Sequence, residues 1–285
     1  MIKYPQIKYL DPKYIKKIIS SMLIEDSPKG DITTNLIVPK KKIIKSEMIA
    51  CENLVFVGEH IIPYFFEENC TIDILSIDGE IINNGDTFAT IIGSANEILL
   101  KERIMLNLIQ RLCGIATLTK KFSEITKPYN IKILDTRKTT PGLRLFEKYA
   151  VKIGGGYSHR LNLSEGILIK DNHIAVSGSV TNAITFIKKN KSLFSIQLEV
   201  DSIDQITEAL EIGVDGFLLD NMSPQLIDQA IKIIKQYKED IFIEVSGGIN
   251  LNNIKSYANN GIDAISIGAL THSAKSSDIS LKFHY

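Results

Sequence analysis

The second half of the chain repeats one pattern, a short apolar run followed by a longer helical stretch. From residue 131 onward the runs are IKILDTRK, GILIKDN, FSIQLEVD, DGFLLDN, IFIEVSGG and DAISIGAL. Stretches with helical periodicity at 203–212, 224–237 and 251–260 separate the later runs. Buried strands that alternate with helices form βαβ units, and these units build a parallel sheet. The pattern therefore predicts an α/β fold.

Unusual residues stand at the carboxyl ends of these runs. They are Arg137, Lys138, Lys170, Glu199, Asp220, Ser246, Gly247, Gly248 and Gly268. In a parallel α/β barrel the strand ends share one rim, and that rim carries the active site. Six units also suit an open doubly wound sheet, but that sheet would spread the same groups along an edge. We therefore expect a barrel with a functional site at its rim.

The first third of the chain reads as mixed α and β. Runs rich in β-forming residues at 45–57 and 71–77 precede a tight turn at 84–85, and apolar residues at helical spacing predict a helix over about 95–112. The 285 residues are 44% hydrophobic and 23% charged, which is typical of a globular protein. The 33 Lys and Arg balance the 33 Asp and Glu, so the basic excess of nucleic-acid-binding or membrane-surface proteins is lacking.

Neither a membrane span nor a secretory signal is expected. Charged residues interrupt every apolar run before the ~18 residues that a bilayer requires, and the basic start has no apolar segment after it. The cysteines Cys51, Cys70 and Cys113 are too far apart for a CxxC pair, which argues against disulfides and zinc and favours the cytoplasm. We expect Cys113 in the core and the isolated His60 and His284 on the surface.

A dense basic region extends from residue 137 to residue 160. It contains six Lys or Arg and one acid, a local charge of 6 − 1 = +5. Lys148 and Lys152 are one helical turn apart and are expected on a solvated face. Arg137, Lys138 and Arg160 adjoin a strand end or the glycine run 154–156, which we interpret as a flexible connection. Cations in such positions suit a small ligand with carboxylates, phosphates or both.

Glu199 and Asp220 end successive runs. Adjacent parallel strands lie ~4.8 Å apart, so the two carboxylates can share a ligand, although a helix cap and a surface ion pair are structural alternatives. Two carboxylates suit Mg²⁺ when a phosphate ligand supplies the remaining oxygens. The glycine loops at 246–248 and 268–269, with His272 after the second, predict a phosphate site, ordinary turns being the alternative.

Together these motifs resemble the quinolinate phosphoribosyltransferase family. The segments that carry the resemblance are DTRKTTPGLR, KYAVKIGGGYSHR, LIKDNHI, LEVDS, LLDNM, EVSGGI, GIDAISIGALTHS and DISLKF, with EDSPKGDITT and ERIMLNLIQRLCGIAT nearer the start. The resemblance implies an N-terminal α/β sandwich domain over 1–112, joined by the tail 274–285. It also implies an incomplete TIM-like barrel over 113–273 that carries the active site. A homodimer with shared active sites is implied, with a hexamer as the alternative.

The resemblance also implies the reaction. The phosphoribosyl group of phosphoribosyl pyrophosphate passes to quinolinate with loss of carbon dioxide, giving nicotinate mononucleotide and pyrophosphate for NAD biosynthesis. Mg²⁺ is implied and an organic cofactor is not, because the alkylated ring nitrogen accepts the electrons released by decarboxylation.

The family's functional residues carry over motif by motif. The resemblance implies that quinolinate is bound by Arg103 from the partner subunit and by Arg137, His159, Arg160 and Lys170. It assigns catalysis to Lys138, Glu199 and Asp220, of which the two acids hold the metal. It assigns phosphoribosyl pyrophosphate to Lys138, Ser246, Gly247, Gly248, Gly268 and His272.

Three residues depart from the family pattern. Ser158 replaces the usual Asn, Asn162 the usual Gly and Glu165 the common Asp. The Ser and Glu variants resemble molybdenum-transport-associated homologues, which typically lack the KDNH and ALTHS segments present here. The alternatives are therefore such a homologue or another pyridine phosphoribosyltransferase, an aldolase-like barrel with a Schiff base on Lys170, and a non-enzymatic anion-binding module.

Overall fold

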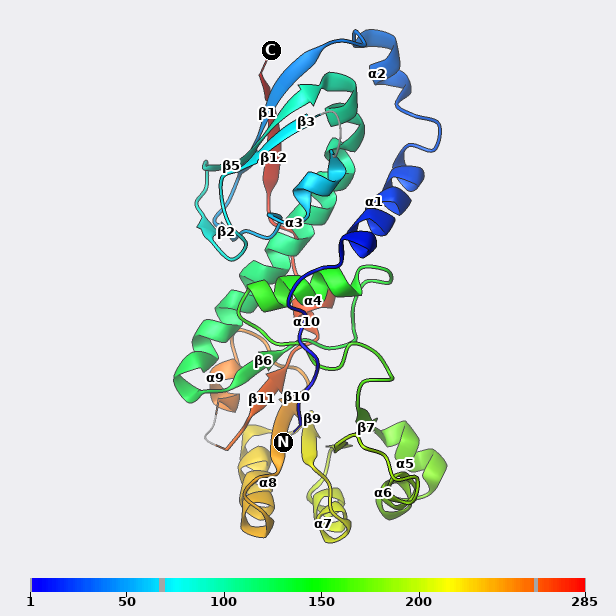
Figure 1. The fold of residues 1–285 in the computed structure, drawn as a ribbon. Helices are drawn as coiled ribbons and strands as arrows, with labels where there is room; N and C mark the ends of the chain where they lie inside the picture. Colours follow the sequence, from blue (N-terminus) through cyan, green and yellow to red (C-terminus); the bar gives the residue numbers. More distant parts are fainter. Residues whose placement is uncertain (1, 67–69, 259–260, 285) are drawn as a thin grey trace. The chain divides into compact units, whose positions relative to one another are not determined.

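A computed structural model describes residues 2–66, 70–258 and 261–284 of the chain (Figure 1). The chain divides into two compact units. The parallel unit comprises Met1–Gln6, Lys121–Lys138 and Gly156–Ala269. The antiparallel unit comprises Ile7–Lys120, Thr139–Gly155 and Leu270–Tyr285. Each unit is therefore assembled from segments that lie far apart in the sequence.

The parallel unit is built on one six-stranded sheet. Its strands are β6 (Lys132–Leu134), β7 (Ile167–Ile169), β8 (Ile196–Val200), β9 (Gly216–Asp220), β10 (Phe242–Ser246) and β11 (Ala264–Ser266). All neighbours pair in parallel, in the order β6-β11-β10-β9-β8-β7. A closed barrel would also pair β6 with β7, and the described residues make no such ladder. The prediction of an incomplete parallel barrel is confirmed.

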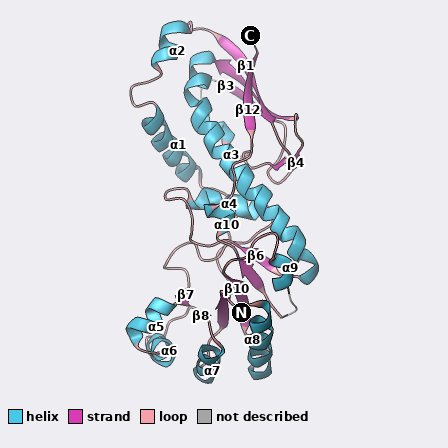
Figure 2. Ribbon diagram, turned by 180° about the vertical axis from the view of Figure 1, so that it is seen from behind, coloured by secondary structure: helices cyan, strands magenta, loops and turns pink. Residues whose placement is uncertain are grey.

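Helices connect these strands. They are α5 (Asp171–Ser177), α6 (Val180–Lys189), α7 (Ile203–Ile212), α8 (Pro224–Tyr237) and α9 (Ile254–Tyr257), and α6 packs on α7 and α7 on α8 (Figure 2). In α8, Ile227, Ala230, Ile231 and Ile234 form one buried stripe at helical spacing. Full burial of each isoleucine contributes about 1.5–3 kcal/mol, which fixes the face that α8 turns inward.

The last helical stretch is shorter than the sequence predicts. The prediction spans 251–260, of which residues 259–260 lie outside the described residues, whereas α9 covers Ile254–Tyr257. The backbone N–H of Asn250 donates to Asn253 Oδ1 at 2.8 Å, and that of Asn252 donates to Asn250 Oδ1 at 2.9 Å. These side chains hold a turn where the pattern predicts the first helical turn, as asparagine commonly does.

The antiparallel unit contains a four-stranded sheet in the order β12-β1-β5-β3. The strands are β1 (Ile43–Ala50), β3 (Cys70–Ile74), β5 (Thr87–Ser94) and β12 (Ile279–His284), and a ribbon of β2 (Leu54–Val55) and β4 (Ile81–Ile82) lies apart from them. Side chains of β1 alternate between exposed and buried, because one face of the sheet covers the core. Since β12 pairs with β1, the end of the chain completes a sheet that begins near residue 43.

The helices of the antiparallel unit include α1 (Pro12–Asp26), α2 (Ile32–Ile37), η1 (Ile62–Phe65) and the 32-residue α3 (Ala95–Thr126), which continues into the parallel unit and η2 (Lys127–Tyr129). The sequence predicts the end of α3 near residue 112. The helix continues because Ile115, Ala116 and Phe122 extend its buried face. Cys113 is fully buried on α3, as predicted. No helix in the described part of the chain has both the length and the apolar composition needed to cross a bilayer.

Close packing explains part of the glycine run. A Cβ at Gly154 would lie 2.4 Å from the carbonyl oxygen of Ala116, so the start of this run is a contact with α3 rather than a flexible connection. The preceding helix, α4 (Arg144–Ile153), is also buried on more than one side. The prediction that Lys148 is solvated is therefore wrong, since its side chain is fully buried. Lys152 is only half-buried and donates to the carbonyl of Lys8 at 3.0 Å.

Candidate active site

Lys170 and Glu199 meet at the carboxyl ends of two neighbouring strands. Ile169 in β7 is the register partner of Leu198 in β8, so the next residue of each strand stands opposite the other. The Lys170 ammonium donates to Glu199 Oε2. The structure thus brings a predicted carboxylate-binding cation into direct contact with a predicted catalytic acid.

Asp220 and Ser246 lie at the next level of the rim. They are register partners at the ends of β9 and β10. Glu199 pairs with Leu218, so Asp220 lies two residues further along β9 on the same face of the sheet. Asp220 Oδ2 accepts a hydrogen bond of 2.7 Å from Asn221 Nδ2. The two predicted metal-binding carboxylates therefore occupy successive levels of adjacent strands.

The loop after β10 allows only glycine at its first position. Gly247 has φ +98°, and a Cβ there would lie 2.2 Å from Asn221 Oδ1 and 2.7 Å from the Asn221 backbone nitrogen. Gly248 has φ +63° with open space around it. The backbone of the loop is thereby kept close to the end of β9, beside the carboxylate of Asp220. Gly268 follows β11, at the end of the next strand in the sheet.

Arg160 is the most enclosed cation of the site. The residue is only 5% exposed, and its Nη1 donates to the carbonyl of Gly166 at 3.1 Å. Burial and the neighbouring charge of Arg137 lower the pKa of Arg160, and the charge of Glu199 opposes that shift. Guanidinium groups keep their proton in proteins, so Arg160 stays a cation held near Arg137 and Glu199. Lys138 follows Arg137, and its backbone N–H donates to Thr136 Oγ1 at 3.0 Å.

His159 lies beneath the rim rather than on it. The residue is 5% exposed, its Nδ1 accepts from the backbone N–H of Arg160 at 2.8 Å, and its Nε2 lies 3.5 Å from Glu244 Oε2. The backbone N–H of His159 donates to Asp135 Oδ1 at 2.9 Å. Direct binding of quinolinate by the His159 ring stays a prediction, because the structure shows both ring nitrogens facing protein groups.

Sequence reasoning missed the polar residues packed around His159. They are the half-buried Tyr4 and the fully buried Gln197 and Glu244. Gln197 precedes Glu199 by two residues in β8, and Glu244 precedes Ser246 by two residues in β10, so each shares a strand face with a predicted site residue. This period of two was a readable signal. No pattern around Tyr4 marks it.

Two of the three departures from the family pattern, Asn162 and Glu165, form one local hydrogen-bonded loop. Glu165 accepts from the backbone N–H of Leu161 at 3.0 Å and from Asn162 Nδ2 at 3.2 Å, and Asn162 Oδ1 accepts from the backbone N–H of Ser164 at 2.8 Å. Ser158 is held through its backbone, which pairs with the side chain of Gln6. The side chains of Asn162 and Glu165 therefore stabilise the 161–165 part of the loop.

Arg103 and His272 belong to the antiparallel unit. Both are exposed, Arg103 on α3 and His272 at the end of α10 (Ala269–His272), where its Nδ1 lies 2.6 Å from Ser273 Oγ. Their predicted roles toward quinolinate and phosphate stay predictions. The other predicted site residues all belong to the parallel unit, at strand ends or in the loops that follow them.

The donor set at the rim suits a metal that arrives with its ligand. Within residues 2–66, 70–258 and 261–284, no three His, Cys, Asp or Glu side chains form a group able to hold a metal ion. Glu199 and Asp220 are a pair only. Mg²⁺ commonly binds one or two carboxylates and takes its remaining oxygens from phosphates and water. The pair fits that mode and does not fit a resident all-protein site.

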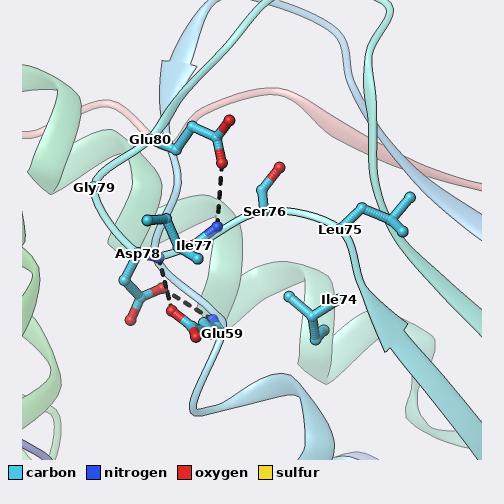
Figure 3. A pocket seen from close by; sticks show the side chains of 8 residues that line it. All are labelled: Glu59, Ile74, Leu75, Ser76, Ile77, Asp78, Gly79 and Glu80. Carbon is cyan, nitrogen blue, oxygen red and sulfur yellow. Dashed lines mark hydrogen bonds between the residues drawn. The ribbon is translucent and has the colours of Figure 1, made fainter.

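A hollow of about 720 Å³ lies in the antiparallel unit, between Glu59 and the loop 74–80 (Figure 3). Its acidic groups are engaged by backbone donors: Asp78 Oδ1 accepts from the N–H of Glu59 at 2.9 Å, and Glu59 Oε2 accepts from the N–H of Asp78 at 3.0 Å. Glu80 likewise accepts from the N–H of Ile77 at 3.2 Å. We interpret these carboxylates as anchors of the loop.

The fold and the rim define a class: an α/β-barrel protein whose strand ends bring a buried arginine and a partly exposed lysine to a pair of carboxylates. Comparison with known proteins gives the family. The model of the quinolinate phosphoribosyl transferase N-terminal domain matches residues 31–113, and that of the C-terminal domain matches residues 115–282. The chain belongs to the quinolinate phosphoribosyl transferase family.

Similar proteins carry a consistent description. A probable nicotinate-nucleotide pyrophosphorylase [carboxylating] of Methanocaldococcus jannaschii is 42% identical over 279 residues, which cover 94% of this chain and 96% of that protein. The protein of the same description from Bacillus subtilis is 39% identical over 271 residues, covering 94% and 92%. The solved structure of the nicotinate-nucleotide pyrophosphorylase from Francisella tularensis superposes with a TM-score of 0.92 at 34% identity, covering 99% of this chain and 100% of that one.

Proposed function

We propose that this protein transfers the phosphoribosyl group of phosphoribosyl pyrophosphate to quinolinate and releases carbon dioxide and pyrophosphate. The product is nicotinate mononucleotide. The observation that carries the proposal is the contact between Lys170 and Glu199, with Arg160 enclosed beside them. Within a family of this description, the contact supports a site in which cations for a dianionic acceptor lie next to acids for an activated sugar.

The cations act by replacing water. Each carboxylate of quinolinate loses solvation on entering the site, and that loss is large unless charged donors compensate it. One cation at ~4 Å contributes roughly 4 kcal/mol of gross Coulomb attraction at an effective dielectric of about 20. Several such attractions come from Arg137, Arg160 and Lys170 and from Arg103 of a partner copy. His159 supports these cations from below.

The acids act on the sugar. The ring nitrogen of quinolinate attacks the anomeric carbon and displaces pyrophosphate, so positive charge develops at that carbon. We expect Glu199 and Asp220 to stabilise this charge and Lys138 to offset the charge of the departing pyrophosphate. The Lys170 ammonium is exchangeable between Glu199 and an incoming carboxylate, which couples occupation of the two halves of the site.

Two further parts of the proposal concern what binds with the substrates. Glu199 and Asp220 would hold the Mg²⁺ that accompanies phosphoribosyl pyrophosphate, and the ion would supply charge neutralisation at the pyrophosphate. The backbone of Ser246, Gly247, Gly248 and Gly268, together with His272, lines the phosphates. A homodimer completes each site with Arg103 of the other copy.

An aldolase-like role for Lys170 is disfavoured by the same contact. A Schiff base requires a neutral amine as nucleophile, and a lysine reaches that state through an apolar pocket or a cationic neighbour. Lys170 instead donates to the carboxylate of Glu199, so its amine is engaged in an ion pair rather than enclosed in an apolar pocket.

The test is incubation of the protein with quinolinate, phosphoribosyl pyrophosphate and Mg²⁺, followed by detection of nicotinate mononucleotide and of carbon dioxide from carboxyl-labelled quinolinate. Nicotinate is the matched control acceptor, since it has no second carboxylate to lose. Product with quinolinate supports the proposal. If nicotinate mononucleotide forms from nicotinate and not from quinolinate, the protein acts on another pyridine acceptor.

A further inference from the structure

The first residues of the chain belong to the barrel. Residues 2–6 are part of the parallel unit although the following segment is not. Ile2 is 8% exposed and packs with Leu134, Phe242 and Ala264, which come from three strands of the parallel sheet, and Tyr4 packs against this cluster. Figure 1 shows the N-terminal segment, in dark blue, running beside these strands. The segment therefore packs on the face of the sheet that carries the site residues.

Gln6 fixes the loop that precedes Arg160. The backbone N–H of Ser158 donates to Gln6 Oε1 at 2.8 Å, and Gln6 Nε2 donates back to the carbonyl of Ser158 at 3.0 Å. A side-chain amide that pairs with both backbone groups of one residue acts as a short strand would. The segment 2–6 thus holds the 158–160 backbone from outside the loop.

Tyr4 touches both residues to which Arg160 is hydrogen-bonded. Its ring stacks on the ring of His159, with centroids 4.2 Å apart and an interplanar angle of 26°. A Cβ at Gly166 would lie 3.1 Å from Tyr4 Cε1, so the ring also covers the Gly166 backbone. Arg160 donates its backbone N–H to His159 Nδ1 and its Nη1 to the Gly166 carbonyl. One aromatic ring therefore supports both anchors of one catalytic-site cation.

A buried polar chain fixes the Tyr4 ring in turn. Tyr4 Oη donates to Gln197 Oε1 at 2.5 Å, and Gln197 Nε2 donates to Glu244 Oε2 at 2.9 Å. The same oxygen, Glu244 Oε2, faces His159 Nε2. Burial, and then the charge of Glu244, raise the pKa of Tyr4 far above its ordinary value, so its hydroxyl remains a donor. Because His159 Nδ1 accepts from Arg160, the ring proton belongs on Nε2, where it points to Glu244.

We propose that Tyr4 and Glu244 are positioning residues for Arg160: the N-terminal segment closes the site from below and fixes the guanidinium through His159 and Gly166. The inference rests on the proposed function for the identity of the ligand, a pyridine dicarboxylate, and not for the geometry. Residues 2–6 lie outside the motifs that carry the family resemblance. They act without touching substrate.

The experiment compares Tyr4→Leu with Tyr9→Leu. Both changes remove an aromatic ring, but Tyr9 is 77% exposed and serves as the matched control. The chain contains five arginines, so selective [¹⁵N]arginine labelling gives five backbone amide signals, and an Arg160→Lys variant identifies that of Arg160. Steady-state kinetics with quinolinate and phosphoribosyl pyrophosphate provide the second measurement.

Tyr4→Leu is expected to move the Arg160 amide signal and to raise the KM for quinolinate about tenfold, which corresponds to about 1.4 kcal/mol. The KM for phosphoribosyl pyrophosphate stays within about twofold, because a misplaced guanidinium affects only the carboxylate pocket. Tyr9→Leu changes neither quantity. Tyr4→Phe keeps the ring and loses only the bond to Gln197, so it moves the same signal less and serves if the leucine variant does not fold.

Two results would overturn the inference. One is an Arg160 amide unchanged in Tyr4→Leu and Tyr4→Phe. The other applies when the wild type is active: it is a Tyr4→Leu protein whose KM rises equally for both substrates or rises for neither. A wild type that forms no nicotinate mononucleotide refutes the proposed function instead, and in that case the arginine spectrum alone decides whether Tyr4 positions Arg160.

Discussion

Gly247 lies at the rim, and both its left-handed backbone conformation and its contact with Asn221 exclude a side chain. We predict that Gly247→Ala lowers the free energy of unfolding by about 3 kcal/mol, since a left-handed conformation costs roughly 1–2 kcal/mol and overpacking against Asn221 adds to it. The KM for phosphoribosyl pyrophosphate rises as well, because the loop moves away from Asp220. Urea unfolding and steady-state kinetics measure the two effects.

Gly248→Ala is the matched control. Its φ of +63° carries the conformational penalty, but nothing lies within 4 Å of the added Cβ. We expect a loss of about 1 kcal/mol and a smaller change in KM. Equal losses in the two variants would contradict the view that contact with Asn221 sets the shape of the loop.

Glu244 makes stability depend on pH. Burial raises the pKa of its carboxyl, but electrostatic attraction to the His159 ring and hydrogen bonds from His159, Ser266 and Gln197 outweigh burial, so the pKa lies below the ordinary 4.5. A carboxyl with a lowered pKa in the folded state stabilises the fold above its unfolded-state pKa, and this stabilisation is lost as the pH falls through the folded-state pKa. We predict that Glu244→Gln costs about 2 kcal/mol at pH 7 and progressively less below about pH 4.5.

Denaturant unfolding at a series of pH values from 7 to 4 checks this prediction. The exposed Glu239 provides the control variant Glu239→Gln, for which the difference from wild type is small at every pH. A cost for Glu244→Gln that stays constant across the range would show that folding does not shift the pKa of this carboxyl.

The rim residues could be predicted from the sequence because each closes an apolar run and parallel strands align their ends. This logic located Lys170, Glu199, Asp220 and Ser246 without any homologue. It could not locate Tyr4, because the contact between Tyr4 and His159 joins residues 155 positions apart (159 − 4) that no periodicity relates. A sequence pattern reports what lies along an element, not which distant segment packs beneath it.

At the scale of elements, Arg111 on α3 and Glu147 on α4 form a polar connection between these two helices. Arg111 Nε donates to Glu147 Oε1 at 2.7 Å, and Glu147 is fully buried. Arg111 also donates to Thr140 Oγ1 at 3.0 Å and to the carbonyl of Thr271 at 2.6 Å. The pair thus holds the loop that follows Lys138 and the segment that ends at His272.

We predict that Arg111→Met destabilises the protein by about 3 kcal/mol, because it leaves the Glu147 carboxylate buried without its cationic partner. Chemical denaturation measures the change. The ion pair of the exposed Lys45 with Glu47 on β1 is the control, and Lys45→Met should leave the free energy of unfolding unchanged within measurement error. A loss for Arg111→Met no larger than the control's would mean that water replaces the guanidinium beside Glu147.

The elements themselves were predictable to different degrees. The strands from β7 to β11 and the helices α7 and α8 follow directly from alternating apolar runs and helical stripes. The true end of α3 did not, because its buried face continues against segments that are distant in sequence. The buried state of Lys148 was missed for the same reason, since spacing within α4 does not reveal what covers the helix.

At the scale of the whole molecule, the segments of one site come from far apart along the chain. The N-terminal residues 2–6, the loop at 158–160 and the strand ends from β7 to β10 all contribute to the parallel unit. The sheet is open between β6 and β7, and on that side Tyr157 bridges to Leu134 and the 158–160 loop begins. An incomplete barrel therefore gains a place for a loop that carries His159 and Arg160.

The proposed homodimer makes the last prediction. Arg103 is exposed on α3, and we propose that it completes the carboxylate pocket of a second copy. Arg103→Ala and Lys138→Ala should then each be nearly inactive, since one lacks a cation for quinolinate and the other lacks the lysine for pyrophosphate. Mixed under conditions that exchange subunits, the two variants form heterodimers in which one site carries both substitutions and the other neither.

Such a mixture should recover up to one active site per heterodimer, and about half of the dimers in an equimolar mixture are heterodimers by random pairing. Activity near a quarter of the wild-type value is therefore expected. Two differently tagged subunits, co-purified from the same mixture, verify the exchange. If exchange is complete and activity stays at the level of the separate variants, Arg103 acts within its own chain or has no part in binding, and the shared site must be abandoned while the rim of the parallel unit stands.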